Sequence, residues 1–282
     1  MIVTGSAKLA GVMGWPVAHS ASPRLHGFWL KRYGIDGAYV PLPVAPQYLI
    51  RCLRVLPHLG FTGVNITLPH KEAVVAAVDS LSASARRIGA VNTVVVGNDG
   101  DLFGDNTDAF GFIENLKEGA PHWEATSGPV VVIGAGGAAR AACVALTDLG
   151  VDEVRVVNRS SARAEALASS LGGPLTVLPW KEKTAALTGA SLVVNATTLG
   201  MTGQPALDID LSALPPGAVV NDFVYSPLET PLLAAAAARG LLAVGGIGML
   251  LHQARPAFAA WFNVDPEVTS ELREFVLASG EV

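Results

Sequence analysis

The chain has 282 residues, of which 50% are hydrophobic and 15% are charged, and its formal net charge at pH 7 is −5. The charged share is well below the roughly 25% of an ordinary soluble domain, so the composition excludes an intrinsically disordered protein and implies a large buried core. The negative charge argues against a nucleic-acid partner. Cys52 and Cys143 show neither metal-ligand spacing nor a disulfide framework, which favours a reducing compartment and predicts no metal site.

The first hundred residues predict an α/β domain with irregular alternation. Strands are expected at residues 9–15 and 64–68, and helices at residues 23–33 and 70–78. Two further extended runs, 90–96 and 101–103, flank a Gly-Asn-Asp-Gly sequence that favours a β-hairpin.

The middle of the chain predicts a doubly wound α/β domain. Short apolar runs rich in β-branched residues end in glycine or a polar residue, as buried parallel strands do. Alanine-rich helical segments alternate with them, which is the pattern of a parallel sheet covered by helices. The predicted strands are residues 130–133, 154–157, 192–194 and 218–220, and the predicted helices are residues 138–149, 161–171 and 181–187.

The most hydrophobic stretch of the chain is residues 231–251. Arg239 and several glycines interrupt it, so it predicts a helix, a strand and a helix in a buried core, with no membrane span. The last 35 residues predict one or two amphipathic helices that pack on the first domain. No secretory signal is predicted at the N-terminus, and the chain is expected to be cytoplasmic.

A glycine motif follows the strand predicted at residues 130–133. Gly134, Gly136 and Ala139 form Gly-x-Gly-x-x-Ala, in which the glycines allow a tight turn and a close approach to a pyrophosphate. The helix N-terminus would present free N–H groups to this anion. An ordinary tight turn between strand and helix is the alternative. The backbone of Ala135, Gly137 and Ala138 belongs to the same predicted cofactor site.

The next predicted strand ends in Asn158-Arg159-Ser160, with Arg163 one turn later. An NAD-binding protein would place an acidic residue there, whereas a guanidinium matches a phosphate. These residues therefore predict NADP(H) as the cofactor. Solvated charges at an exposed helix start are the alternative.

Several motifs resemble those of the shikimate dehydrogenase family, in family order over nearly the whole chain. The family's Ser-x-Ser-Pro and Asn-x-Thr-x-Pro-x-Lys stretches correspond to residues 20–23 and 65–71. The other matching stretches are Gly-Ala-Val-Asn-Thr at 89–93, Gly-Asp-Asn-Thr-Asp at 104–108, Asn-Ala-Thr-Thr-Leu-Gly-Met at 195–201, Asp-Phe-Val-Tyr-Ser-Pro at 222–227 and Met-Leu-Leu-His-Gln at 249–253.

The resemblance implies reversible, NADPH-dependent reduction of 3-dehydroshikimate to shikimate in the pathway to chorismate. It also implies a substrate domain at residues 1–107 and 248–282 and a Rossmann-type NADP-binding domain at residues 108–247. By resemblance, Lys71 is the acid/base residue, and Asp108 orients it and binds substrate. His70 is the rival proton donor, but its side chain would point away from Lys71 on a helix, so a surface histidine is expected.

A polyhydroxylated ring with a carboxylate needs short neutral donors and acceptors. By resemblance Ser20, Ser22 and Tyr225 hold the carboxylate, and Asn65, Asn92 and Gln253 bind ring hydroxyls together with Asp108. Any of these serines and asparagines could instead be a helix cap or turn residue, and Ser22 before Pro23 would make a good N-cap. The remaining predicted site residues are Thr67 for the substrate and Thr197, Met201 and Gly246 for the cofactor.

Three positions depart from the commonest family pattern: Ala109, Ser160 and Gly245. Ser160 keeps the hydroxyl of the usual threonine, whereas Ala109 and Gly245 leave the efficiency and the exact substrate open. A paralogue acting on quinate or an aminoshikimate is therefore an alternative, and so is a non-catalytic NADPH-binding sensor on the same fold. The expected partner is a small-molecule substrate, and the chain is expected to be a monomer or a homodimer.

Overall fold

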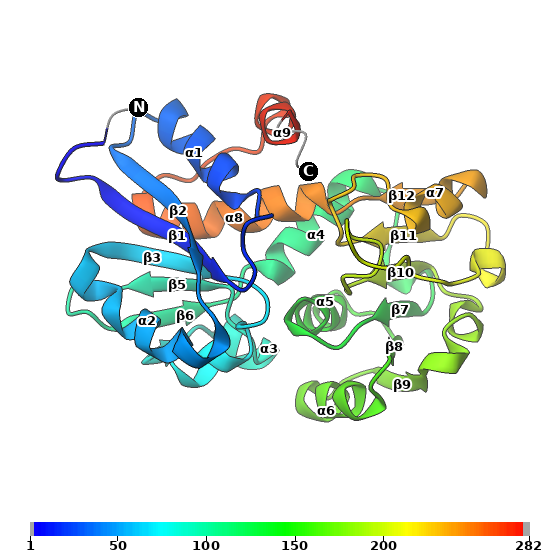
Figure 1. The fold of residues 1–282 in the computed structure, drawn as a ribbon. Helices are drawn as coiled ribbons and strands as arrows, with labels where there is room; N and C mark the ends of the chain where they lie inside the picture. The colour runs from blue at the N-terminus through cyan, green and yellow to red at the C-terminus, as the bar shows by residue number, and fades with distance from the viewer. Residues whose placement is uncertain (1–2, 279–282) are drawn as a thin grey trace. The chain divides into compact units, whose positions relative to one another are not determined.

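A computed structural model of the chain describes residues 3–278, which divide into two compact units (Figure 1). The first unit runs from the N-terminus to Thr107 and resumes at Gln253, and the second unit is Asp108–His252. Each unit contains one six-stranded sheet. The two-sheet α/β fold confirms the predicted fold class.

The sheet of the first unit is mixed, with the strand order β2-β1-β3-β5-β6-β4. β1 runs parallel to both β2 and β3, whereas β5 is antiparallel to β3 and β6. The carboxyl ends of β1, β3 and β6 therefore share one edge with the start of β5. The strands are β1 (Lys8–Gly14), β2 (Gly37–Pro43), β3 (Phe61–Ile66), β4 (Ser80–Leu81), β5 (Thr93–Val96) and β6 (Leu102–Asp105).

Helices cover this sheet and connect its strands. α1 buries Leu25 and Trp29, and Trp261 of α8 (Ile247–Phe262) donates its indole N–H to the Val94 carbonyl at 3.1 Å. The helices are α1 (Ser22–Arg32), α2 (Leu49–Val55), α3 (Ala83–Ile88) and α9 (Ser270–Leu277), with 3₁₀ helices η1 (Pro46–Tyr48), η2 (Pro57–Leu59) and η3 (Ala73–Ala76).

The sheet of the second unit is entirely parallel, with the strand order β12-β11-β10-β7-β8-β9. The chain moves outward from β7 to β9, then returns to β10 on the other side of β7 and continues to β12. The border between β7 and β10 is therefore the switch point at which ligands bind in such sheets. The strands are β7 (Val130–Ile133), β8 (Val154–Asn158), β9 (Leu175–Pro179), β10 (Leu192–Asn195), β11 (Val219–Asp222) and β12 (Leu242–Val244).

The helices of the second unit lie on both faces of this sheet. They are α4 (Asp108–Gly119), α5 (Gly137–Asp148), α6 (Ser161–Leu171) and α7 (Pro231–Ala238), with 3₁₀ helices η4 (Ala125–Ser127), η5 (Trp180–Glu182), η6 (Ala185–Leu187) and η7 (Leu211–Ala213). α8 (Ile247–Phe262) begins in the second unit and ends in the first.

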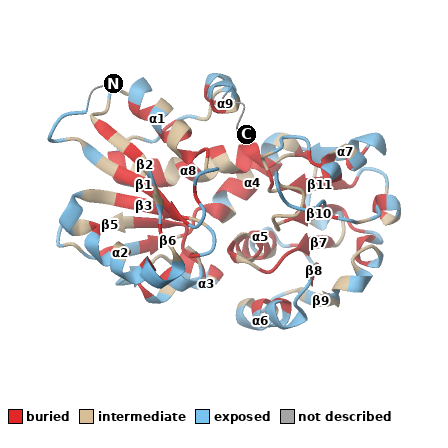
Figure 2. Cartoon of the chain, viewed as in Figure 1, coloured by how far each residue is buried: buried red, intermediate tan, exposed pale blue. Residues whose placement is uncertain are grey.

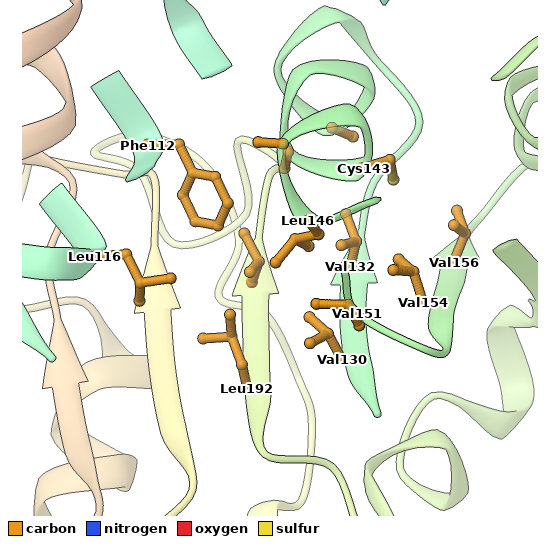
Figure 3. Packing of buried hydrophobic residues seen from close by; sticks show 14 of the residues in the cluster. Phe112, Leu116, Val130, Val132, Cys143, Leu146, Val151, Val154, Val156 and Leu192 are labelled. Atoms are coloured by element: carbon orange, nitrogen blue, oxygen red, sulfur yellow. The ribbon is translucent and has the colours of Figure 1, made fainter. Parts of the chain in front are cut away.

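Valine-rich strands form the core of the second unit. Val130 and Val132 pack with Leu146 of α5 and Phe112 of α4 (Figure 3), while Val131 belongs to the cluster on the opposite face. Because both faces of these strands are covered, the strand sequences are continuous apolar runs. Figure 2 shows this burial concentrated on the strands and the exposed residues on the outer helices.

Two predicted helices are wrong. Residues 70–78 contain only the short 3₁₀ helix η3, because the Lys71 carbonyl accepts a hydrogen bond from Val91 N at 2.8 Å and is not available to a helix. Residues 181–187 contain the end of η5 and all of η6, which Lys183 and Thr184 separate. β2, β4, β9, α2, α3 and α4 were not predicted. None of the helices in residues 3–278 combines the length and hydrophobicity needed to cross a bilayer.

Candidate active site

Short polar residues gather at the shared edge of the first sheet. Backbone hydrogen bonds place the chain after β3 beside the end of β1, since Thr67 N donates to the Met13 carbonyl at 2.9 Å and Trp15 N donates to the Leu68 carbonyl at 3.0 Å. Ser20 and Ser22 follow β1. Ser22 is the first residue of α1 and caps nothing, because the N-cap residue is Ala21 and no side chain bonds to it. The alternative interpretation of Ser22 as an N-cap is therefore wrong.

Lys71 lies in the turn that follows β3 at this edge. His70 fixes the turn, because its Nε2 lies 2.7 Å from the Val44 carbonyl, to which it donates. The His70 side chain is 1% exposed, so the prediction of a surface histidine is wrong. The bond from Val91 N to the Lys71 carbonyl brings the backbone of Lys71 next to Asn92. The lysine side chain itself is partly exposed.

Asn92 has several partners at the start of β5. Its Oδ1 accepts from Thr107 N at 2.9 Å and from Thr93 Oγ1 at 3.0 Å, and its Nδ2 donates to Thr107 Oγ1 at 2.9 Å and Gln253 Oε1 at 3.2 Å. Thr107 Oγ1 in turn donates to the Gln253 carbonyl at 2.8 Å. The first unit thus brings two predicted substrate residues, Asn92 and Gln253, into direct contact.

Both ends of the Asn65 amide are engaged inside the first unit. Oδ1 accepts from the Tyr39 hydroxyl at 2.7 Å, and Nδ2 donates to the Asn92 carbonyl and to Thr93 Oγ1, each at 3.2 Å. Asn65 is only 6% exposed. These contacts tie the Asn65 side chain to Tyr39 on β2 and to the start of β5, next to Asn92.

Burial sets the protonation of the aromatic residues behind Asn65. It raises the pKa of Tyr39 well above 10, with a hydrogen bond from Ser22 opposing the shift. It lowers the pKa of His26 to about 3, with Asn65 opposing. The His26 ring stacks on the Tyr39 ring with centroids 4.1 Å apart. Tyr39 is therefore a neutral phenol and His26 a neutral imidazole at neutral pH.

The glycine turn of the second unit has the geometry that a pyrophosphate needs. Gly134 has φ +123, and a Cβ there would lie 2.9 Å from the Ala196 carbonyl of the loop after β10. Gly136 is the N-cap of α5, and a Cβ there would meet nothing within 4 Å. The turn at the switch point between β7 and β10 is thus bare and opens on a helix N-terminus, which fits a dinucleotide.

The end of β8 carries the predicted adenosine-side residues. Ser160 caps α6 by accepting from Arg163 N, and Asn158 Nδ2 donates to the Ser160 carbonyl at 2.9 Å. Arg159 and Arg163 are exposed. Ser160 thus has a structural role that the sequence had not shown, and the guanidinium groups are accessible to an anionic ligand.

A buried carboxylate, Asp222, ties together the loops after β10 and β11. Asp222 Oδ1 accepts from Asn195 Nδ2 at 2.9 Å and from Val224 N at 3.0 Å, and Oδ2 accepts from Thr230 Oγ1 at 2.7 Å. Asn195 Oδ1 also accepts from Thr197 Oγ1 at 2.7 Å. Burial raises the pKa of Asp222 to about 6, and these three hydrogen bonds oppose the shift.

The loops that this carboxylate holds carry other predicted site residues. Thr197 and Met201 follow β10, Tyr225 follows β11, and all three are partly exposed. Gly246 has a close packing role, because a Cβ there would collide with the Phe223 carbonyl. Asp108 is the first residue of α4 and is 4% exposed.

Sequence reasoning missed the residues that hold the site from behind. Tyr39 and Thr230 stood in no motif, and Thr93, Thr107, Asn195 and Asp222 stood inside family motifs without a role of their own. Within residues 3–278 no cluster of His, Cys, Asp or Glu side chains could hold a metal ion.

The chain is similar to proteins of one family over almost its whole length. The family descriptions "Shikimate dehydrogenase substrate binding domain" and "Shikimate / quinate 5-dehydrogenase" match residues 12–94 and 119–201. A shikimate dehydrogenase (NADP(+)) of Paramagnetospirillum magneticum is 62% identical over 98% of this chain and 100% of that protein.

Solved structures agree with this similarity. The shikimate 5-dehydrogenase of Thermus thermophilus, in complex with NADP(H) and shikimate, has a TM-score of 0.85 and 40% identity, covering 96% of this chain and 99% of that one. The quinate dehydrogenase of Corynebacterium glutamicum, in complex with NAD, has a TM-score of 0.87 and 34% identity, with the same coverage of 96% and 99%.

Proposed function

The chain belongs to the shikimate dehydrogenase family, and on that premise we propose that it catalyses the reversible, NADP-dependent reduction of 3-dehydroshikimate to shikimate. The observation that carries this proposal is the polar edge of the first sheet, where Thr67, Lys71 and Asn92 lie at the ends of neighbouring strands. Neutral donors and acceptors beside one ammonium group suit a polyhydroxylated ring that bears a ketone.

Lys71 is the proton donor in this proposal. Reduction of the ketone leaves negative charge on its oxygen, so a proton donor must lie within hydrogen-bond reach of that atom. The Lys71 ammonium gives its proton to the oxygen, and in the reverse direction the amine takes the proton from the hydroxyl. His70 is unsuited to this role, because its buried ring is engaged with the Val44 carbonyl.

The hydroxyl groups of Ser20 and Ser22 bind the substrate carboxylate, and Asn92 and Gln253 bind ring hydroxyls. Support for the first pair is that both serines follow β1 at the polar edge and that Ser22 is not used as a helix cap. The Ser22 hydroxyl also bonds to Tyr39. Asp108 and Tyr225 belong to the second unit. In this proposal Tyr225 binds the substrate carboxylate, and Asp108 orients Lys71 and binds a ring hydroxyl, as the family resemblance implies.

The second unit would hold NADP(H). When bound, this cofactor supplies or accepts the hydride. Gly134 and Gly136 leave the turn bare for the pyrophosphate, and the exposed Arg159 and Arg163 bind the 2′-phosphate that distinguishes NADP from NAD. The backbone of Ala135, Gly137 and Ala138, the side chains of Asn158, Ser160 and Thr197, and Met201 and Gly246 complete the proposed cofactor site.

Initial rates of shikimate and quinate oxidation, each with NADP⁺ and NAD⁺, test this function. We expect fast turnover only with shikimate and NADP⁺, and a loss of about 10²–10⁴-fold in kcat for Lys71→Ala, which is the usual contribution of a positioned acid/base group. Lys31→Ala, on an exposed position of α1, is the matched control and should keep full activity.

Other outcomes of this experiment point elsewhere. Preference for quinate would assign the chain to a paralogue within the family. Binding of NADPH without turnover of either compound would favour an amino-substituted substrate or a sensor. A Lys71→Ala variant with unchanged kcat would remove the lysine from the chemistry.

A cytoplasmic location and a monomeric or homodimeric state are also part of the proposal. Cys143 is a buried free thiol whose pKa burial raises to about 12, and Cys52 is free as well. Free thiols in both positions suit a reducing compartment. Size-exclusion chromatography with light scattering would determine the oligomeric state.

A further inference from the structure

A continuous chain of buried hydrogen bonds runs through the first unit behind the polar edge. Its members, which we call the polar relay, are Tyr39, Asn65, Thr93, Asn92 and Thr107, and each is less than a tenth exposed. We propose that the polar relay fixes which end of the Asn92 amide is presented to the substrate. This inference rests on the proposed function. Tyr39 and Thr93 are then positioning residues that act through their neighbours.

Tyr39, whose hydroxyl also takes a hydrogen bond from Ser22, begins the relay on β2 and reaches over β1 to β3. Ala10 of β1 pairs with Tyr39 in the register, whereas Asn65 of β3 pairs with Val12, two residues further along β1 on the same face. The alanine side chain is small enough to let the tyrosine ring pass over the strand. The stacked ring of His26 holds the Tyr39 ring in place, and the hydroxyl donates to Asn65 Oδ1 at 2.7 Å.

The direction of each hydrogen bond then follows from the number of hydrogens available. With Oδ1 taken by Tyr39, Asn65 Nδ2 donates to the Asn92 carbonyl and to Thr93 Oγ1. A hydroxyl has one hydrogen, so Thr93 Oγ1 accepts from Asn65 and gives its own hydrogen to Asn92 Oδ1 at 3.0 Å. Thr107 N adds a second donor to Asn92 Oδ1 at 2.9 Å.

Asn92 is therefore held with its oxygen toward the interior of the unit. Its Nδ2 gives its two hydrogens to Thr107 Oγ1 and Gln253 Oε1. A ligand that binds this end must therefore offer an acceptor oxygen in place of one of these two. If the relay is broken, a buried donor or acceptor loses its partner, which is costly. Asn92 Oδ1 then keeps the Thr107 N donor but loses the Thr93 donor, so its orientation is held less strongly. A rotated amide would present Oδ1, which would repel the same acceptor oxygen.

Tyr39→Phe and Thr93→Val test the relay, because each removes one hydroxyl and keeps the shape of the side chain. We expect each variant to raise the KM for shikimate by about three- to tenfold, the range for one hydrogen bond in such a network, with kcat changed less than about twofold. The double variant should raise KM no more than the larger single effect, because both substitutions interrupt the same series of hydrogen bonds and their effects should not add. Thr93→Ser keeps the hydroxyl and should restore the wild-type KM.

A measurement without turnover accompanies the kinetics. The side-chain amide resonances of Asn92, assigned by NMR through Asn92→Asp, should shift in Tyr39→Phe, because the effect passes from Tyr39 through Asn65 and Thr93. Tyr33→Phe is the control, because the Tyr33 hydroxyl accepts from Glu267 N at 3.2 Å and lies outside the relay. It should change neither the KM nor the Asn92 signals.

The outcomes separate the relay from the proposed function. Unchanged Asn92 signals together with additive effects on KM would overturn the relay. If the wild-type protein oxidises neither shikimate nor quinate, the proposed function fails, and the shift of the Asn92 signals still decides whether Tyr39 orients that amide.

Discussion

Replacement of Asp222 by asparagine tests how the second unit holds its loops. Asp222 is 0% exposed, and its three neutral donors come from Asn195, Val224 and Thr230. Burial is the largest influence on its pKa, which rises from 3.8 to about 6. Asparagine has almost the same volume but cannot ionise, so Asp222→Asn removes the cost of the buried charge together with part of the hydrogen bonding.

The sign of the pH effect follows from the raised pKa. Between about pH 4 and pH 6 the folded state binds more protons at Asp222 than the unfolded state does, so the free energy of unfolding falls as pH rises through this window. A shift of about two units corresponds to about 3 kcal/mol in full, at about 1.4 kcal/mol per unit. About 2 kcal/mol of this is lost between pH 4.5 and pH 7.5.

We therefore expect wild type to exceed Asp222→Asn in stability at pH 4.5, and the difference to shrink by about 2 kcal/mol at pH 7.5. Urea unfolding followed by the fluorescence of Trp123 and Trp180, which pack against the two clusters of the second unit, measures this difference. Asp210→Asn is the matched control, because hydrogen bonds from Ser212 lower the pKa of this exposed carboxyl. Its stabilising contribution is present above the unfolded pKa and is lost as pH falls, the opposite direction. A constant or widening difference for Asp222→Asn would refute the reasoning.

Two further substitutions test the cofactor site and the packing of the first unit. Arg159→Ala should lower the preference for NADP⁺ over NAD⁺, measured as the ratio of kcat/KM values, by about 10- to 100-fold. The reason is that a charge-assisted hydrogen bond contributes about 1.5–3 kcal/mol. An unchanged ratio would mean that this guanidinium does not bind the 2′-phosphate. Gly63→Ala should lower the free energy of unfolding by about 2 kcal/mol or more, because its Cβ would collide with the Trp261 indole and the Val94 carbonyl. A Cβ at Gly27 in α1 meets nothing within 4 Å, so Gly27→Ala should be neutral or stabilising by up to about 1 kcal/mol; urea unfolding measures both variants.

The elements that were predictable from the sequence are those whose local pattern and tertiary role agree. β7, β8, β10 and β11 are covered on both faces, so their apolar runs were visible along the chain. β2 was missed because Pro41 and Pro43 weaken its strand signal, and the structure explains them by its position at the edge of the sheet.

The residues of the candidate site also fall into those that local motifs predict and those that depend on tertiary contacts. Lys71, Arg159 and the glycine turn stand in local motifs, and their roles remain predictions that the kinetic experiments test. The contacts of Asp222 with Asn195 and of Tyr39 with Asn65 join residues 27 and 26 positions apart. Such pairs depend on strand order and register, which local patterns do not contain.

The division of the first unit into two segments has a consequence for synthesis on the ribosome. The second unit, Asp108–His252, is continuous and has all its strands once that segment has emerged. Folding of the first unit requires its C-terminal segment, which begins at Gln253, because the indole of Trp261 bonds to the Val94 carbonyl and Phe275 packs on Phe28. Until α8 and α9 are made, the face of the sheet that Trp261 covers stays exposed. We therefore expect the nascent chain to fold its middle first, and we expect truncation before Trp261 to leave the N-terminal sheet prone to aggregation.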